Sequence, residues 1–114
     1  MPWYGLNAME GMSLSKPVLS DLSDKHYTEL FFRYTGLDEC PIVNTPFSQI
    51  KEKLGMLIKN PELRRELGEA GRRSVLKYHS YEAVGKMWDE VYRKVWHEEN
   101  IDLSVWHPDR FQDR

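Results

Sequence analysis

The 114-residue sequence is poor in cysteine, in long apolar runs and in any excess of charge. Its single cysteine, Cys40, excludes a disulfide within the chain. No stretch approaches the roughly 20 apolar residues that a membrane span needs, and no signal peptide is visible at the N-terminus. The formal net charge of -2 argues against a general nucleic-acid binder, which is usually basic. These absences predict a soluble, cytoplasmic protein with no nucleic-acid partner.

The composition that is present is typical of one globular domain. Hydrophobic residues make up 40% of the chain and aromatic residues 12%, which is enough for a packed core. Cys40 has no activating base beside it in the sequence, so a nucleophilic role is not expected. No cofactor or metal is predicted, because no metal-ligand spacing relates the histidines to Asp, Glu or Cys; these are His26, His79, His97 and His107.

Residues 3–20 are the most informative stretch, and they predict a glycine turn, a short helix, a second turn and a buried strand. Gly5 lacks a Cβ, so the backbone there can bend sharply or let a ligand approach closely. Lys16–Pro17 ends the helix, because proline has no amide proton to donate. Val18–Leu19 is short and apolar, as in a strand covered on both faces. The apolar positions at helical spacing are Leu6, Ala8, Met9 and Met12.

The start of this helix is a candidate binding site. Its unpaired N–H groups and the positive end of its dipole favour an anion such as a phosphate group. Glu10, one to two turns further along, is a candidate acceptor for the hydroxyl groups of a sugar. The alternative interpretation is an ordinary turn before a helix, with Glu10 simply solvated.

The rest of the chain alternates loops, helices and one further strand. Asp21–Asp24 is polar and predicts a loop at the carboxyl end of a strand, where ligands bind in open α/β sheets. Thr45–Pro46 and Asn60–Pro61 each combine a capping residue with a proline at a helix start, and Ser80 caps the last helix. The expected helices cover about 23–34, 46–59, 61–78 and 81–96, and the second strand covers 40–44.

Side-chain spacing predicts which faces of these helices are apolar. Gly68 and Gly71 inside the third of them indicate close packing against another backbone. Burial is expected in the second of them at Phe47, Ile50, Leu54, Leu57 and Ile58. The last helix carries one stripe made of Val84, Met87, Trp88, Val91, Tyr92 and Val95, and the row Trp88, Tyr92 and Trp96 is interpreted as packing.

The basic residues of the third expected helix are interleaved with glutamates. This pattern is typical of a solvated face, and peripheral contact with an anionic membrane surface is the less favoured alternative. The group consists of Arg64, Arg65, Arg72, Arg73 and Lys77.

Four pieces of the sequence, in order, resemble retaining glycosyltransferases with the GT-B fold, the group 1 enzymes similar to glycogen synthase and sucrose synthase. Tyr4-Gly5-Leu6 stands in place of that family's Phe-Gly-Leu, Glu10 matches the second of two glutamates, and Lys16-Pro17-Val18 matches as it stands. Residues 60–72 resemble the family's "dpelr…lgeagr" helix, and residues 78–81 resemble the start of its last helix. The resemblance covers roughly residues 4–96.

The resemblance implies a partial Rossmann-like α/β unit, a small parallel sheet with mostly helices, which forms the C-terminal half of a nucleotide-sugar-binding domain over residues 1–96. Residues 97–114 form a C-terminal tail. Donor-binding positions carried over from the family are Tyr4, Gly5, Leu6 and Glu10. The implied function is binding of a nucleotide diphosphate sugar for hexosyl transfer.

Departures from the family pattern limit that implication. The first glutamate of the pair falls on Pro2, and the glycines that follow the first strand in the family are absent after Ser20. Ser15 replaces the usual glycine before Lys-Pro. The family's basic pair and acceptor domain have no counterpart here, so we expect the chain to be inactive alone. A second chain or another copy is expected to complete the domain, and the alternative is a non-catalytic protein-interaction module.

Overall fold

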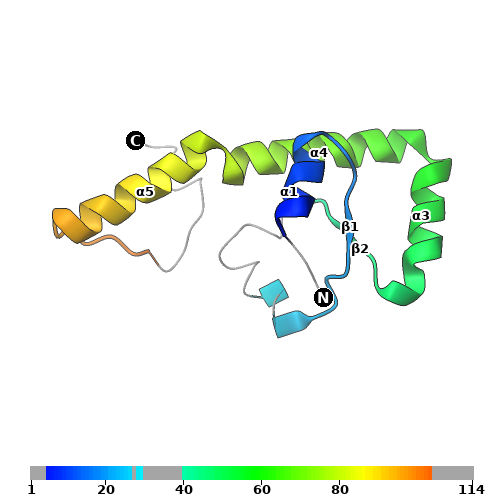
Figure 1. Ribbon diagram of the computed structural model, residues 1–114, viewed down its shortest axis with the longest axis horizontal. Helices are drawn as coiled ribbons and strands as arrows, with labels where there is room; N and C mark the ends of the chain where they lie inside the picture. The colour runs from blue at the N-terminus through cyan, green and yellow to red at the C-terminus, as the bar shows by residue number, and fades with distance from the viewer. Residues whose placement is uncertain (1–4, 27, 30–39, 104–114) are drawn as a thin grey trace.

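A computed structural model of the chain describes residues 5–26, 28–29 and 40–103 (Figure 1). The described elements are α1 (Leu6–Ser13), β1 (Leu19–Ser20), β2 (Val43–Asn44), the 3-10 turn η2 (Phe47–Gln49), α3 (Ile50–Lys59), α4 (Pro61–His79) and α5 (Tyr81–Trp96). Helices dominate and the two strands pair in parallel, so the predicted α/β class with a small parallel sheet is confirmed.

The first helix ends through a Schellman motif with a serine in the glycine position. The Lys16 amide donates to the Gly11 carbonyl over 3.0 Å, and the Ser15 amide donates to the Met12 carbonyl over 2.9 Å. Ser15 adopts a left-handed conformation with φ of 57°. The predicted end of the helix before Lys16–Pro17 is therefore confirmed, and Ser15 occupies a backbone conformation that glycine adopts without strain.

The two short strands are parallel, so their carboxyl ends lie at the same edge of the sheet. Leu19 pairs with Val43 and Ser20 with Asn44. The Val43 amide donates to the Val18 carbonyl over 2.9 Å, and the Thr45 amide donates to the Ser20 carbonyl over 2.8 Å. Strand β1 lies one residue later than the predicted pair Val18–Leu19, and β2 is shorter than the predicted range 40–44; the predicted parallel sheet is confirmed.

Helix α3, which corresponds to the helix expected over residues 46–59, departs from two predictions. Thr45 does not cap it: its buried hydroxyl donates to the Val43 carbonyl over 2.8 Å, and the chain makes a 3-10 turn before α3 begins at Ile50. The expected burial holds only for Leu57, whereas the other four apolar side chains are exposed. These are Phe47, Ile50, Leu54 and Ile58.

The position of α3 explains that correction. It stands at one end of α4 and projects away from the region where α1 meets α4 (Figure 1). Leu57 is 3% exposed. Arg64 of α4 reaches back to α3, where its Nη1 donates to the carbonyls of Leu57 and Ile58 over 2.6 and 2.7 Å. An apolar stripe is buried only where another element lies beside it, and among the described residues none covers the rest of this stripe.

Helix α1 packs across the long helix α4. Its N-terminus is capped as predicted, because the Leu63 amide donates to Asn60 Oδ1 over 3.0 Å. Gly68 and Gly71 are buried where α1 crosses α4, which confirms the predicted close packing. A small core forms beside this crossing from Ala8, Met12 and Ile42, with Met9, Val18, Leu22, Cys40 and Val75 packed against it.

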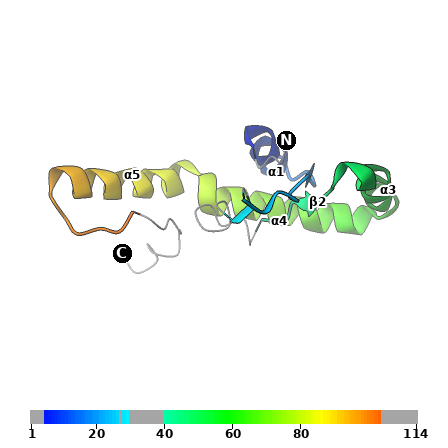
Figure 2. The same ribbon diagram turned by 90° about the horizontal axis from the view of Figure 1, so that it is seen from below.

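Helix α5 continues from α4 and extends beyond the part of the molecule that carries α1 and the sheet (Figures 1 and 2). Ser80 separates the two helices, and its hydroxyl accepts a 3.1 Å hydrogen bond from the Ala83 amide, as predicted for a cap. The aromatic row packs on itself: ring centroids lie 6.2 Å apart between Trp88 and Tyr92 and 5.9 Å apart between Tyr92 and Trp96. Each of these side chains is more than half exposed.

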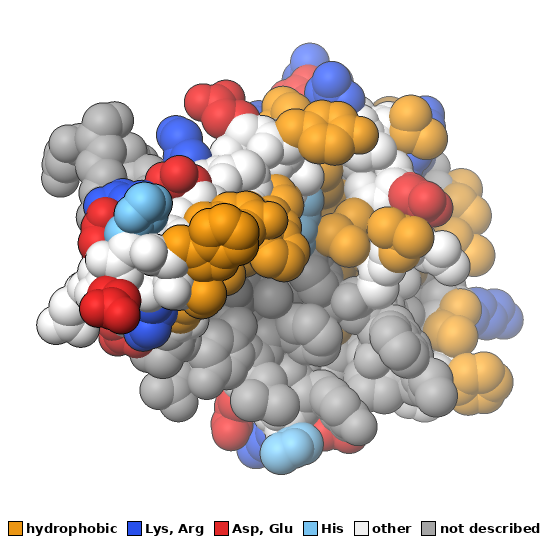
Figure 3. Space-filling model, turned by 60° about the vertical axis from the view of Figure 1, so that its left-hand side comes forward, with side chains coloured by type: hydrophobic (Ala, Val, Ile, Leu, Met, Phe, Trp, Pro, Cys, Tyr) orange, Lys and Arg blue, Asp and Glu red, His pale blue; other side chains and the backbone are white. Residues whose placement is uncertain are grey.

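Hydrophobic side chains consequently gather along α5 on the molecular surface (Figure 3). The segment after the helix folds back onto it: Arg93 pairs with Glu99, and Lys94 Nζ donates to the Ile101 carbonyl. Ile101 is buried. Residues 97–103 are thus joined to α5.

The helix predicted from residue 23 or 24 to residue 34 is described only in part. Lys25, His26, Thr28 and Glu29 are helical, and the Thr28 amide donates to the Asp24 carbonyl over 3.0 Å. The remaining positions of that prediction, and residues 104–114 of the predicted tail, lie outside the described residues.

Candidate functional site

A pocket of about 400 Å³ lies between the start of α1 and strand β1. Gly5 precedes the helix in an extended conformation, with φ of -113° and ψ of 179°, and turns the chain into its first turn. Ser20 stands at the carboxyl end of β1, so the pocket joins a helix N-terminus to a strand edge. Its lining residues are Gly5, Leu6, Asn7, Ala8, Val18, Leu19 and Ser20.

The electrostatics of this pocket suit an anion. The Gly5 carbonyl accepts from the amides of Ala8 and Met9, while no hydrogen bond joins the amides of Leu6 and Asn7 to another described residue. No acidic side chain lies in the first turn, and no side chain caps the helix. Unpaired amides at the positive end of a helix dipole are the donors that bind phosphate groups.

The predicted site residues fall in different places. Gly5 and Leu6 line the pocket, whereas Tyr4 lies outside the described residues. Glu10 is exposed and is not among the lining residues. Because residues three and four apart share a helix face, Glu10 lies on the side of α1 that also carries Leu6 and Asn7. Its carboxylate is therefore placed beyond the pocket, one turn along the same face.

Sequence reasoning missed Asn7, Ser20 and the residues that precede Ser20 in β1. Asn7 lies in the first turn of α1 with an exposed side chain. The signal that could have identified Ser20 is its position directly after the apolar pair Val18–Leu19, at the edge of the sheet where α/β proteins bind ligands.

A second pocket, of about 370 Å³, adjoins the first at the carboxyl ends of both strands. The two pockets share Leu19 and Ser20. Beyond these, the second pocket is lined by residues of the loop after β1, the end of β2 and the start of α3: Asp21, Thr45, Phe47 and Ile50.

Hydrogen bonds fix the loop after β1, whose first residue, Asp21, lines the second pocket. Asn44 Oδ1 accepts from the Leu22 amide over 2.9 Å, which ties the loop after β1 to the end of β2. Asp21 Oδ1 accepts from the Ser23 amide over 2.9 Å. Hydrogen bonds from the side chain and then the backbone of Ser23 lower the pKa of the Asp21 carboxyl group, so this side chain is an anionic acceptor at neutral pH.

The basic residues of α4 mostly serve the fold. Arg64 satisfies carbonyls at the end of α3, Arg72 donates to the Ser13 carbonyl at the end of α1, and Arg65 pairs with Glu62. Two of these contacts close helix C-termini, where a cation is favourable. Two residues of the predicted solvated face, Arg64 and Arg72, thus cap the C-terminal ends of other helices.

Cys40 is half-buried against the core, and its thiol lies 3.6 Å from Met12 Sδ. Burial raises the pKa of this thiol, which disfavours the nucleophilic thiolate. Burial also lowers the pKa of His79, at the end of α4. Across residues 5–26, 28–29 and 40–103, no three His, Cys, Asp or Glu side chains are grouped in a way that could hold a metal ion.

A parallel strand edge joined to an uncapped helix N-terminus defines an α/β unit with the geometry of a phosphate-binding site. The sequence profile of the family described as "Glycosyl transferase-like" matches residues 8–90. The chain belongs to this family. The resemblance to glycosyltransferases that the sequence predicts is therefore confirmed.

One curated relative is an uncharacterized glycosyltransferase of Methanocaldococcus jannaschii, which is 36% identical over 92 residues. The match covers 77% of this chain and 25% of that protein, so the chain spans about a quarter of the relative's length. No solved structure matches the chain. None of the helices in the described part of the chain has the length and apolar character needed to cross a membrane.

Proposed function

We propose that this chain is the segment of a glycosyltransferase that binds the nucleotide diphosphate sugar from which a hexosyl group is transferred. The observation that carries the proposal is the first pocket, in which the amides of Leu6 and Asn7, unpaired among the described residues, meet the carboxyl end of β1. In this proposal the diphosphate lies against these amides, where backbone donors and the helix dipole act together.

Glu10 is assigned to the ribose of the donor. A carboxylate accepts two hydrogen bonds from neighbouring hydroxyl groups, and Glu10 lies one turn beyond the amides on the same face of α1. A diphosphate at the start of the helix would place its attached ribose within reach of this side chain. Asn7, which lines the pocket, supplies a further amide group toward the same ligand.

We expect the chain to provide binding groups but not the groups that a transfer reaction needs. Charged hydrogen bonds from two amides and one carboxylate contribute about 1.5–3 kcal/mol each, whereas association costs about 4–15 kcal/mol. We therefore expect roughly millimolar affinity for the isolated chain. Pro2 carries no carboxylate at the position of the family's first glutamate, so we expect no donor turnover by this chain alone.

Titration of the ¹⁵N-labelled chain with UDP, GDP and ADP tests the proposal. We expect saturable shifts at the amides of residues 5–10 and 20–22, largest for the nucleotide whose base fits. Glu10→Gln removes the charge of the ribose acceptor and should weaken the shifts, while Glu66→Gln, a change in an exposed glutamate of α4, should leave them unchanged. A folded spectrum with no shifts for any nucleotide contradicts the proposal.

A second candidate is a non-catalytic interaction module that keeps the fold and binds a protein. The exposed apolar faces of α3 and α5 favour it: Ile58 is 65% exposed and Trp96 is 74% exposed. Nucleotide titration separates the two candidates, because the module requires no response at the start of α1.

A further inference from the structure

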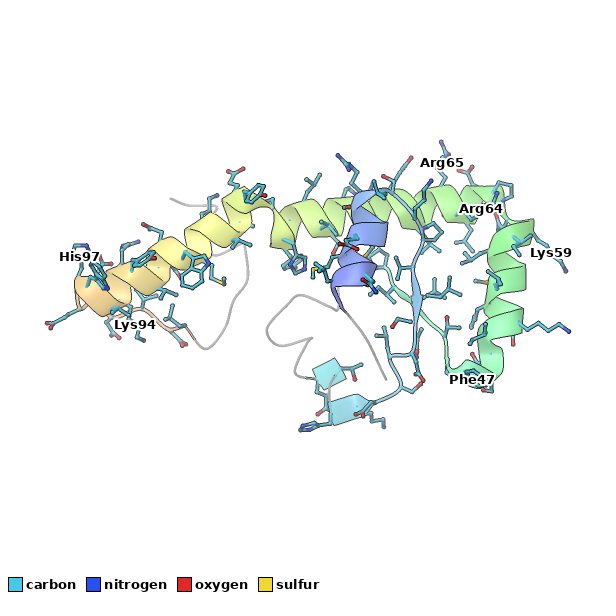
Figure 4. The ribbon with its side chains drawn as sticks, viewed as in Figure 1. Phe47, Lys59, Arg64, Arg65, Lys94 and His97 are labelled. Atoms are coloured by element: carbon cyan, nitrogen blue, oxygen red, sulfur yellow. The ribbon has the colours of Figure 1, made fainter. Side chains whose placement is uncertain are left out.

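The second pocket has an apolar wall that the packing of the fold does not use. Phe47 is 87% exposed and Ile50 is 43% exposed, and both line the pocket. Phe47 lies at the foot of α3, at the end remote from α4 (Figure 4). A large exposed aromatic side chain gathered with other apolar surface in a concave site marks a place where a ligand binds.

The remaining lining of this pocket is polar. Ser20, Asp21 and Thr45 come from the carboxyl ends of the two strands. The Thr45 hydroxyl is committed to the Val43 carbonyl, and the Ser23 amide holds the Asp21 carboxylate in a fixed orientation. The pocket therefore combines an aromatic ring, an aliphatic side chain and an anionic acceptor.

A pyranose ring matches this combination. One face of such a ring presents C–H groups, which carry partial positive charge and lie well against the negative face of an aromatic ring. Its edge presents hydroxyl groups, which donate well to a carboxylate. A phosphate group fits poorly here, because Asp21 is anionic and no cationic side chain is among the described lining residues.

The position of the pocket also suits a saccharide. It shares Leu19 and Ser20 with the pocket assigned to the diphosphate, so the two pockets adjoin at strand β1. The hydrogen bond from the Leu22 amide to Asn44 holds the loop that carries Asp21 in place. A sugar attached to the diphosphate, or a saccharide lying beside it, would reach Phe47 along the edge of the sheet.

We propose that the second pocket is a saccharide subsite, with Phe47 as the stacking surface and Asp21 as the hydroxyl acceptor. This inference rests on the proposed function, because the subsite adjoins the proposed donor site. The residues assigned to the saccharide, Phe47 and Asp21, line only the second pocket. The saccharide can be the sugar of the donor or part of an acceptor, since the same ring chemistry serves both.

The test compares UDP, UDP-glucose and maltotriose in titrations of the ¹⁵N-labelled chain, with saturation transfer from protein to sugar C–H protons as a second readout. If the subsite takes the donor sugar, UDP-glucose shifts the amides of residues 45–50 beyond the effect of UDP. If it takes an acceptor sugar, maltotriose alone shifts them. Either result supports the subsite, and no response of residues 45–50 or of the sugar protons to any saccharide overturns it.

Variants of Phe47 test the stacking role directly. Phe47→Ala should weaken the saccharide response about three- to ten-fold, and Phe47→Trp should retain it. Ile58→Ala is the matched control, because Ile58 is also an exposed apolar residue of this region but does not line the pocket. Equal responses of Phe47→Ala and Ile58→Ala overturn the assignment.

The amides of residues 5–8 report the diphosphate site in the same spectra. If they respond to UDP while residues 45–50 ignore every saccharide, the subsite is wrong and the proposed donor site stands. If residues 45–50 respond to a saccharide while residues 5–8 ignore UDP, the donor site is wrong and the subsite stands.

Discussion

The backbone of Gly68 touches the backbone of Ser15, so closely that a Cβ on Gly68 would overlap the Ser15 carbonyl oxygen. Gly71 repeats the contact one turn later, where a Cβ would lie 2.9 Å from Met12 Cγ. Through these contacts α4 sets the position of the end of α1, and α1 in turn forms one wall of the first pocket. Gly68 and Gly71 thus help to position the candidate site, because they let α1 pack closely on α4.

Gly68→Ala is predicted to destabilise the fold. Alanine is intrinsically better than glycine in a helix, but the overlap with Ser15 lies against backbone that cannot move cheaply. Overpacking of this kind costs about 1–3 kcal/mol of unfolding free energy. Gly55→Ala is the control: nothing lies within 4 Å of its Cβ position in α3, and it should stabilise by about 0.4–1 kcal/mol. Urea unfolding of both variants measures the difference, and equal effects would contradict the packing.

Ser15→Gly is predicted to stabilise the chain by about 0.5–1 kcal/mol, because Ser15 holds a φ of 57° at the position that ends α1. Ser13→Gly, only two residues earlier, is predicted to destabilise the chain. Ser13 is helical and its hydroxyl donates to the Glu10 carbonyl over 2.7 Å, so glycine there loses both the bond and helix propensity. Thermal melts of the two variants should move in opposite directions; a lower midpoint for Ser15→Gly would refute the expectation.

Local chemistry explains which parts of the fold the sequence predicts well. The cap at Asn60, the cap at Ser80 and the helix end before Lys16 each depend on a few adjacent residues. The strand at Val18–Leu19 was expected from a local pattern as well, whereas the α/β class with a small parallel sheet was implied by the resemblance to glycosyltransferases.

Burial could not be predicted in the same way. Ile50, Leu54 and Leu57 have helical spacing and lie in α3, but that spacing does not say whether another element covers each of them. Thr45 failed as a cap because a 3-10 turn over Phe47–Gln49 follows it, so that α3 begins only at Ile50, five residues later.

Some residues of the candidate site could be predicted from the sequence and others could not. Gly5 was predicted because a glycine before a helix is visible in the sequence, and Leu6 was carried over from the family resemblance. The meeting of Ser20 with Thr45 and Phe47 depends on the register that pairs Leu19 with Val43, which no local pattern contains. The assignment of these residues to a donor remains a prediction.

Unfolding free energy is predicted to fall as the pH falls through the range of His79. Burial lowers the pKa of His79 from 6.5, so at lower pH the unfolded chain binds a proton on this side chain more readily than the folded chain does. The stability is fully present above pH 6.5 and is lost as the pH falls toward the folded pKa. Urea unfolding at pH 5 and pH 7.5 measures this, and His79→Gln should reduce the difference; an unchanged difference would exclude His79 as its source.

Cys40 is predicted to react slowly with a thiol reagent in the folded chain. Its pKa is raised by burial, so less thiolate is present at a given pH, and its thiol packs against Met12. Reaction with Ellman's reagent at pH 8 should accelerate strongly once urea unfolds the chain. A rate in the native state equal to that of the unfolded chain would show that the contact with Met12 is not maintained.

The most direct test of the donor-site account follows the Leu6 and Asn7 amides while UDP, uridine and inorganic pyrophosphate are added separately to the labelled chain. If the unpaired amides at the start of α1 bind the diphosphate, UDP and pyrophosphate shift these two resonances and uridine leaves them in place. Equal shifts with uridine, or no shift with UDP at millimolar concentration, would contradict the account.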